Sequence, residues 1–244
     1  MSEQKAFEYW LFRIGGAAAI FGSLFAAVGN ILHPVTPRHD PEGVARVIAQ
    51  SEQWTLIHLI IIFGTILMLA GMIAIRHSIE GGLPEALARL GVYAGTIGVT
   101  VGVITVILDG VAAKQLADQW AIAPESEKQI ALAMVSVNET MNFALAGLFN
   151  MSFAGVPFIL LGLAVALSHI FPRWLGWTAT FAGVGSIGAA LIQAFTGEPT
   201  MASLILTLIG PTVISLWLLV MGILLVRNTS RLVRSALPLE SSGN

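Results

Sequence analysis

Seven polar side chains fall within or at the ends of long apolar stretches, and their types are those that bind metal ions, relay protons or hold polar ligands. They are His33, His58, Asp109, Asn138, Glu139, Asn142 and Gln193. An ionisable side chain inside a membrane span is costly, so it marks a functional hypothesis. A histidine and an aspartate that meet can bind a divalent metal or pass a proton, and the metal ligands would then be His33, His58 and Asp109. We therefore predict a ligand-binding site formed by these seven residues.

The same residues also have structural interpretations. The carboxyl of Asp109 could tie helices together, and His58 could be an interfacial or hydrogen-bonded histidine. His33 precedes a proline at a helix end, where a capping role is the alternative. A haem held between helices needs axial histidines at matching depth, and the two pairs that could match are His33 with His58 and His77 with His169. No cofactor is predicted, and haem and a divalent metal are kept as alternatives.

Several classes of function are excluded by what the sequence lacks. No HExxH, GxSxG, P-loop or dinucleotide-binding motif occurs. The chain has no cysteine, which removes disulfides, thiolate metal sites, iron–sulfur clusters and cysteine nucleophiles. A formal net charge of −2 argues against binding nucleic acid. We predict no catalytic residue and favour a protein that is not an enzyme.

The composition is that of a membrane protein. Of the 244 residues, 56% are hydrophobic and 11% are charged, whereas soluble domains carry about 25% charged residues. The mean hydropathy is +0.83. Six apolar stretches are long enough to cross a bilayer, at about 12–32, 55–75, 88–112, 140–168, 175–195 and 203–226. We predict an all-α bundle of six transmembrane helices that forms one domain over residues 1–234, followed by a polar tail at 235–244.

The basic residues predict the orientation of the bundle. An even number of spans places both termini on one side of the membrane. If that side is the inner one, the inner segments hold Lys5, Arg13, Arg76, Arg89, Arg173, Arg227, Arg231 and Arg234, and the outer loops hold Arg38, Arg46, Lys114 and Lys128. Basic residues are enriched on the cytoplasmic side. We therefore expect a multi-pass protein of the cell inner (plasma) membrane with both termini in the cytoplasm.

The outer connections are predicted to form a helical cap. The stretch HDPEGVARVIAQSEQW reads as a short helix with Asp40 as its N-cap and Pro41 in its first position. It suits an interfacial helix or a lid on the bundle. The third span is expected to continue outward through AAKQLADQW, and a new helix from Pro124 to lead into the fourth span. Trp54 and Trp120 are expected in the outer aromatic belt.

Small residues form a stripe along each outward-running span. In the third span, Gly91, Gly95, Gly98, Gly102, Thr105 and Asp109 are spaced by four and three residues, which is a heptad pattern. The first span carries Gly15, Ala19, Gly22, Ala26 and Gly29 before His33, and the fifth carries Gly176, Ala179, Gly183, Ser186 and Ala190 before Gln193. Small residues allow helix backbones to approach closely in lipid. We expect helices one, three and five to meet along these seams, with the carboxyl of Asp109 turned into the bundle.

Two segments carry a family resemblance. The second span, WTLIHLIIIFGTILMLAGMIAI, and the stretch SHIFPRWLGWTATFAGVGSIGAALIQAFTG resemble uncharacterised bacterial polytopic membrane proteins of the domain-of-unknown-function type. In those proteins a PRWLG-like turn opens a late helix. The resemblance covers the second, fourth and fifth spans. It implies a six-helix inner-membrane protein and brings no assigned reaction.

Three functions are consistent with the sequence. The leading hypothesis is a protein that binds or transports a small polar or amphipathic ligand, a lipid or an ion at an outer-leaflet pocket around Asp109 and His58. The second is a redox or metal-binding membrane subunit that uses the histidines. The third is a non-catalytic scaffold or accessory subunit whose seams pack against a partner. The expected partners are the lipid bilayer, a small-molecule or lipid ligand, and a second copy of the chain or another membrane protein; nucleic acid is not expected.

Overall fold

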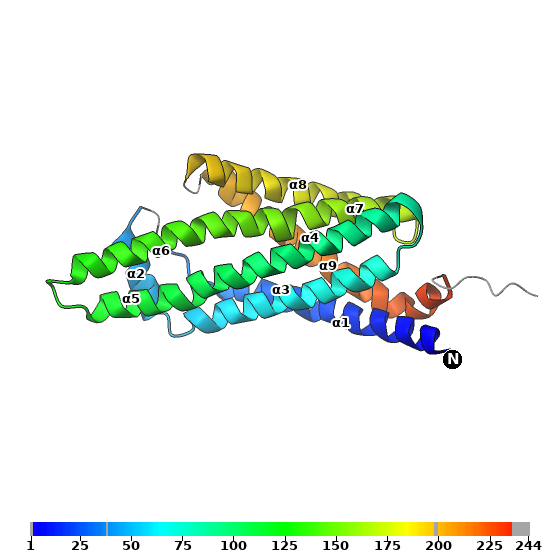
Figure 1. Ribbon diagram of the computed structural model, residues 1–244, viewed down its shortest axis with the longest axis horizontal. Helices are drawn as coiled ribbons and strands as arrows, with labels where there is room; N and C mark the ends of the chain where they lie inside the picture. Colours follow the sequence, from blue (N-terminus) through cyan, green and yellow to red (C-terminus); the bar gives the residue numbers. More distant parts are fainter. Residues whose placement is uncertain (1, 38, 198–199, 236–244) are drawn as a thin grey trace, which may run out of the picture.

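The computed structural model describes residues 2–37, 39–197 and 200–235, and within these ranges every regular element is a helix. The elements are α1 (Glu3–Leu32), α2 (Pro41–Gln50), α3 (Trp54–His77), α4 (Gly82–Val106), the π-helix η1 (Ile107–Ala112), α5 (Ala113–Ile122), α6 (Lys128–Phe149), the π-helix η2 (Asn150–Gly155), α7 (Val156–Ser168), α8 (Arg173–Thr196) and α9 (Met201–Ser235). They form an elongated bundle of roughly parallel and antiparallel rods (Figure 1). The predicted all-α class is confirmed.

Six helical runs are long and apolar enough to cross a membrane. They are Glu3–Leu32, Trp54–His77, Gly82–Ile122, Lys128–Ser168, Arg173–Thr196 and Met201–Arg234. Each run contains one of the six predicted spans, so the six-helix membrane bundle is confirmed. Residues 236–244 of the predicted tail lie outside the described residues. The single domain over 1–234 stays a prediction.

The two ends of the bundle differ. The N-terminal end of α1 and the C-terminal end of α9 lie together at one end, and α2 and α5 lie at the opposite end (Figure 1). We call this opposite end the distal end; it corresponds to the outer side of the sequence prediction. The cytoplasmic location of the termini stays a prediction.

The small-residue seams are packing faces, but they do not meet one another as expected. The α1 seam packs on α3 and, at Ala19, on α9. The α4 seam packs on α3, α6, η2 and α7, and the α8 seam packs on η2, α7 and, at Ser186, on α9. A Cβ atom added to Gly98 of α4 would lie 2.6 Å from the Cα of Phe153 in η2. The seams therefore face helices of the opposite direction. Consecutive spans are neighbours in space, and most of these close approaches occur between them, with that of α1 to α9 as an exception.

The distal cap contains the predicted lid helix. The Asp40 carboxylate accepts a hydrogen bond of 2.9 Å from the backbone N–H of Gly43 and so caps α2, as predicted. The helix expected from Pro124 instead begins at Lys128, because Glu125–Glu127 form a turn after the proline. Trp54 and Trp120, predicted for the outer aromatic belt, are instead buried within the protein.

These two tryptophans are buried under the cap. Trp54 is 1% exposed and packs in a small apolar cluster with Val44 and Ile48 of α2 and Ala113 and Ala117 of α5. The lid helix thus uses its apolar face to cover the N-terminal end of α3. The cover matters for function, because the first turns of α3 carry the side chains described next.

Candidate functional site

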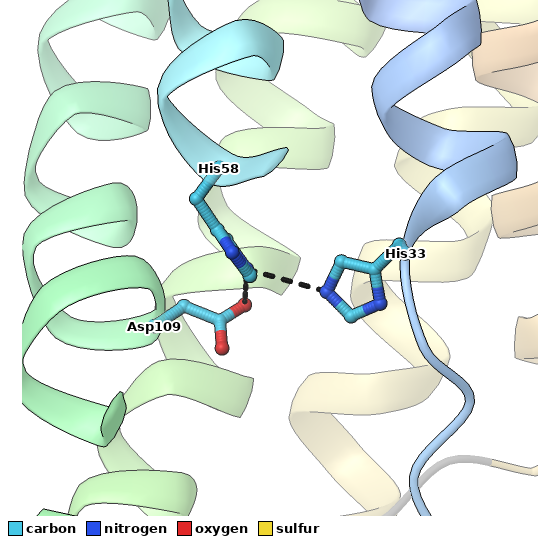
Figure 2. A group of neighbouring side chains, drawn as sticks. All are labelled: His33, His58 and Asp109. Atoms are coloured by element: carbon cyan, nitrogen blue, oxygen red, sulfur yellow. Dashed lines mark hydrogen bonds and ion pairs between the residues drawn. The ribbon is translucent and has the colours of Figure 1, made fainter. Parts of the chain in front are cut away.

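Three side chains from distant parts of the chain converge near the distal end of the bundle. His33 follows α1, His58 lies one turn into α3, and Asp109 lies in η1 (Figure 2). The Nε2 atoms of His33 and His58 are 3.2 Å apart, and the Nε2 atom of His58 is 3.1 Å from Oδ2 of Asp109. One ligand atom from each of the three residues lies within 4.8 Å of the other two. We call His33, His58 and Asp109 the trio.

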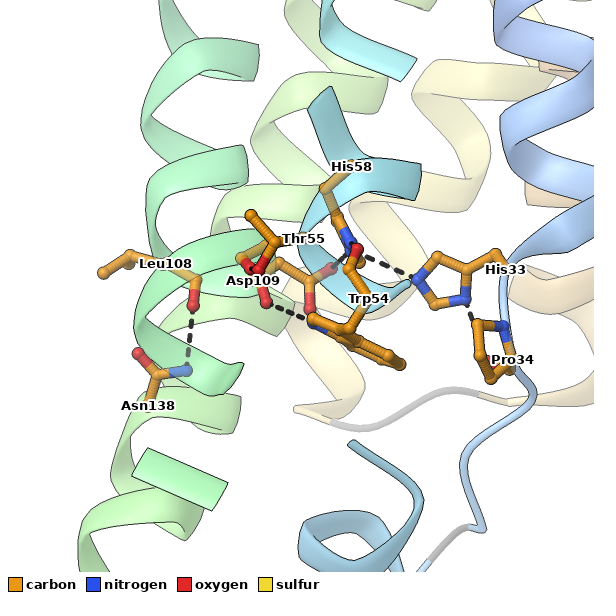
Figure 3. Close-up of polar contacts among 9 residues, drawn as sticks. His33, Pro34, Trp54, Thr55, His58, Leu108, Asp109 and Asn138 are labelled. Atoms are coloured by element: carbon orange, nitrogen blue, oxygen red, sulfur yellow. Dashed lines mark hydrogen bonds and ion pairs between the residues drawn. The ribbon is translucent and has the colours of Figure 1, made fainter. Parts of the chain in front are cut away.

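The second ring nitrogen of each of the two histidines, Nδ1, is hydrogen-bonded to the backbone. Nδ1 of His33 donates to the carbonyl of Pro34 at 2.9 Å, and Nδ1 of His58 donates to the carbonyl of Trp54 at 2.7 Å (Figure 3). A carbonyl oxygen can only accept, so the hydrogen of each ring resides on Nδ1. In the neutral rings both Nε2 atoms therefore carry lone pairs, and these lone pairs face each other and the carboxylate.

The trio is shielded from water to different degrees. His58 is 4% exposed, and the side chain of Asp109 is 21% exposed. Burial, together with the neighbouring His58, lowers the pKa of His33. Three groups with acceptor atoms thus share a partly enclosed space, and such a set is stable only with a cation or protons between its members.

The π-helix η1 places Asp109 in this space. Three consecutive carbonyls of the widened turn accept hydrogen bonds from side chains of other helices (Figure 3). Trp54 Nε1 donates to the carbonyl of Asp109 at 2.6 Å, Thr55 Oγ1 donates to that of Gly110 at 2.7 Å, and Asn138 Nδ2 donates to that of Leu108 at 3.2 Å. π-Helical turns inside α-helices are rare and are frequent at functional sites.

A glycine makes room for His58. A Cβ atom on Gly110 would lie 2.5 Å from Cβ of His58 and 3.0 Å from its Cγ. Real Cβ contacts are not this short, so only glycine at position 110 lets η1 and α3 approach with the imidazole between them. The position of the ring in the trio therefore depends on a residue that carries no chemistry.

The remaining predicted site residues lie on α6 and α8. Asn138 is 7% exposed, and its Nδ2 donates to the Leu108 carbonyl of η1, so it positions the trio from outside. Glu139 and Gln193 line a cavity of about 800 Å³ beside the trio. One side-chain oxygen each of Glu139, Asn142 and Gln193 is buried without a hydrogen-bond partner. The seven predicted residues thus form three groups: the trio, Asn138, which supports η1, and the three residues with unsatisfied acceptor oxygens.

Sequence reasoning missed three contributors: Trp54, Thr55 and Gly110. Trp54 and Thr55 lie one turn before His58 on α3, so their proximity to the site could have been inferred from helical spacing. Their hydrogen bonds to η1 could not, because no sequence signal marks the π-helix. Gly110 directly follows Asp109 but lies outside the heptad seam.

These features define a six-helix integral membrane protein with a cluster of two histidines and one aspartate near one end of its bundle. The chain belongs to the family described as Domain of unknown function (DUF4386), whose model matches residues 86–222. The matched segment includes Asp109, Asn138, Glu139 and Gln193, and it begins after His33 and His58. The resemblance to a domain-of-unknown-function family is confirmed. No curated protein and no solved structure shows significant similarity to the chain.

Proposed function

We propose that this membrane protein binds a divalent transition-metal ion, with Zn²⁺ as the best fit, through His33, His58 and Asp109. One observation carries the proposal: the two Nε2 lone pairs and the Asp109 carboxylate converge while both Nδ1 hydrogens are engaged elsewhere. A cation at the centre would convert three mutually repelling acceptors into three ligands.

The spacing of the ligand atoms fits a small ion. Zinc binds histidine nitrogen at about 2.0–2.1 Å, so two ligands at a tetrahedral angle are separated by about 3.3 Å. The separations within the trio are 3.2 Å between the two Nε2 atoms and 3.1 Å between His58 Nε2 and Asp109 Oδ2. Two of the three separations thus match zinc geometry, and the His33 and Asp109 ligand atoms, which lie within 4.8 Å of each other, complete the set.

The surroundings of the trio also resemble those of metal sites. Histidine ligands of metals commonly donate their second ring N–H to a carbonyl, which fixes the tautomer and the ring orientation. Both imidazoles of the trio do so. Three protein ligands leave a coordination position for water or a ligand atom, as in open zinc sites that act as Lewis acids. The nitrogen and oxygen set also suits Fe²⁺.

A haem between His33 and His58 fits less well. The ring centroids are 4.9 Å apart, and the rings meet edge to face at 68°. A flat macrocycle needs a histidine on each face, with open space between the two rings. The contact distance between these imidazoles supports one small ion in place of a cofactor.

The experiment is a metal analysis of the protein purified in detergent and supplied with Zn²⁺ or Co²⁺. We expect about one ion per chain, with the visible absorption of Co²⁺ bound to nitrogen and oxygen ligands. His58→Ala and Asp109→Asn should lose most of this binding. His169→Ala, at an exposed histidine outside the trio, is the matched control and should bind like the wild type. Equal metal content in wild type and His58→Ala would reject the proposal, and so would an equal loss in the control.

A scaffold makes the opposite predictions. It would co-purify with one membrane partner, contain no stoichiometric metal and tolerate Asp109→Asn. A transporter or receptor of a polar ligand would lose ligand-dependent thermal stabilisation in Asp109→Asn or His58→Ala while keeping its fold. The same purified variants therefore test all three functions.

A further inference from the structure

We infer that the cavity between α6 and α8 is a binding site for a single-chain amphipathic molecule with an ammonium head group. The inference goes beyond the proposed metal site, because none of the trio lines this cavity. It rests on the shape of the cavity, on the distribution of polar groups along it, and on two buried oxygens that lack a partner.

The cavity follows one face of α6. Its lining residues from Val135 of α6 to Met151 of η2 are spaced alternately by one and three positions, over a length of about 24 Å at 1.5 Å per residue. Part of α8 forms the facing wall, and Thr36, Pro37, His39 and Asp40 line the distal end. A volume of about 800 Å³ is within the usual range for small-molecule sites. This long shape suits an extended chain.

The polar lining residues all lie in the distal part of the cavity. They are Thr36, His39, Asp40, Ser136, Glu139, Thr140 and Gln193, and the apolar Val44 and Val135 lie among them. Farther along α6, toward the middle of the fourth span, the walls are Phe143, Ala144, Leu148 and Met151. An amphipath would therefore place its head group at the distal end and its hydrocarbon chain deeper in the membrane, as a bilayer lipid does.

The chemistry of the head group follows from the unsatisfied atoms. Oε1 of Glu139 and Oε1 of Gln193 both belong to residues that line the cavity, and both are buried without a partner. Gln193 is 7% exposed. A buried acceptor without a donor costs stability, so a ligand that donates hydrogen bonds here would be favoured.

The charges favour a cation among the donors. Glu139 and Asp40 carry carboxyl groups, His39 is the other ionisable lining residue that the structure describes, and no lysine or arginine is among the described lining residues. An ammonium group supplies both hydrogen-bond donors and positive charge, an alcohol supplies a donor without the charge, and a carboxylate would be repelled. Among compounds with hydrocarbon chains of equal length, we expect the amine to bind most tightly, the alcohol less tightly and the acid least.

Binding can be measured with the full chain in nanodiscs of phosphatidylcholine. The probes are tetradecylamine, tetradecanol and tetradecanoic acid, and the readouts are the shift in thermal unfolding midpoint and retained adducts in native mass spectrometry. Ala144→Phe places a large ring in the apolar part of the cavity and should abolish amine binding. Ala133→Phe makes the same change at an exposed position of α6 outside the cavity and should leave binding intact.

A second variant tests the head group. Glu139→Gln removes the charge with little change in shape, and it should weaken tetradecylamine at least about tenfold while sparing tetradecanol. The metal content of this variant should equal that of the wild type, so this inference and the metal proposal can fail separately. Binding of the acid as tightly as the amine, or equal binding by Ala144→Phe and Ala133→Phe, would overturn the inference.

Discussion

His33 Nε2 lies 3.2 Å from His58 Nε2, although the hydrogen of each ring is donated from Nδ1 to a backbone carbonyl. Two neutral imidazoles have no hydrogen to share in this arrangement. The contact therefore needs a positive charge between the rings and the Asp109 carboxylate, which either a proton or a metal ion supplies. The metal proposal takes the second of these.

The first prediction concerns Gly110. In Gly110→Ala the new methyl group would collide with Cβ of His58 at 2.5 Å, so the imidazole or η1 must move. We expect Co²⁺ affinity to fall at least tenfold, because a movement of several tenths of an ångström spoils the ligand geometry. The measurement is a Co²⁺ titration followed by absorbance.

The matched control for Gly110→Ala is Gly188→Ala. A Cβ atom there would meet only Leu206, at an ordinary 3.7 Å. Its Co²⁺ affinity should match that of the wild type. If the two alanine variants bind Co²⁺ equally well, the close approach of η1 to α3 does not position the trio.

The second prediction concerns Trp54. Trp54→Phe keeps an aromatic ring under α2 but removes the donor to the Asp109 carbonyl. A buried carbonyl that loses its donor costs about 1–3 kcal/mol, so we expect a lower thermal unfolding midpoint and weaker metal binding. Trp174→Phe, at a 63% exposed position, should change neither. A Trp54→Phe protein with unchanged midpoint and metal affinity would show that this hydrogen bond does not support η1.

The third prediction concerns the seam of α4. Gly98→Leu would drive a side chain into the backbone of Ser152 and Phe153 in η2, where an added Cβ already lies 2.6 Å away. Overpacking costs about 1–3 kcal/mol or more, so the folded yield and the thermal midpoint should fall. Thr100→Leu, on the exposed face of the same helix, should be tolerated. Equal tolerance of both leucines would contradict the packing role of the seam.

The fourth prediction concerns removal of the metal. An ion that binds only the folded protein stabilises it by about 2.7 kcal/mol when its free concentration is a hundred times its dissociation constant. A chelator should therefore lower the thermal midpoint of the wild type and leave that of His58→Ala unchanged. A chelator effect of the same size in both proteins would place the stabilising ion outside the trio.

The sequence alone determined the class of the fold and the candidate residues. A membrane-spanning helix can be recognised in a sequence because about twenty apolar residues are needed to cross the bilayer. It must be a helix because the backbone groups have no water to bind there and must form hydrogen bonds with one another. The heptad spacing correctly placed Asp109 on a packing face, because the spacing of residues along a helix determines the side of the helix on which each side chain lies. The N-cap of α2 at Asp40 depends only on residues 40–43, and it was also predicted correctly.

The tertiary structure decided which faces meet and how the polar groups divide. The seams pack on neighbouring antiparallel helices because pairing depends on contacts between helices, which spacing within one helix does not specify. Trp54 and Trp120 are buried because α2 and the extensions of the third and fourth spans fold over one another. The contact between His58 and Asp109 depends on η1, whose backbone carbonyls accept hydrogen bonds from side chains of α3 and α6. Such a turn is stabilised by its partners, and so only the folded arrangement reveals it.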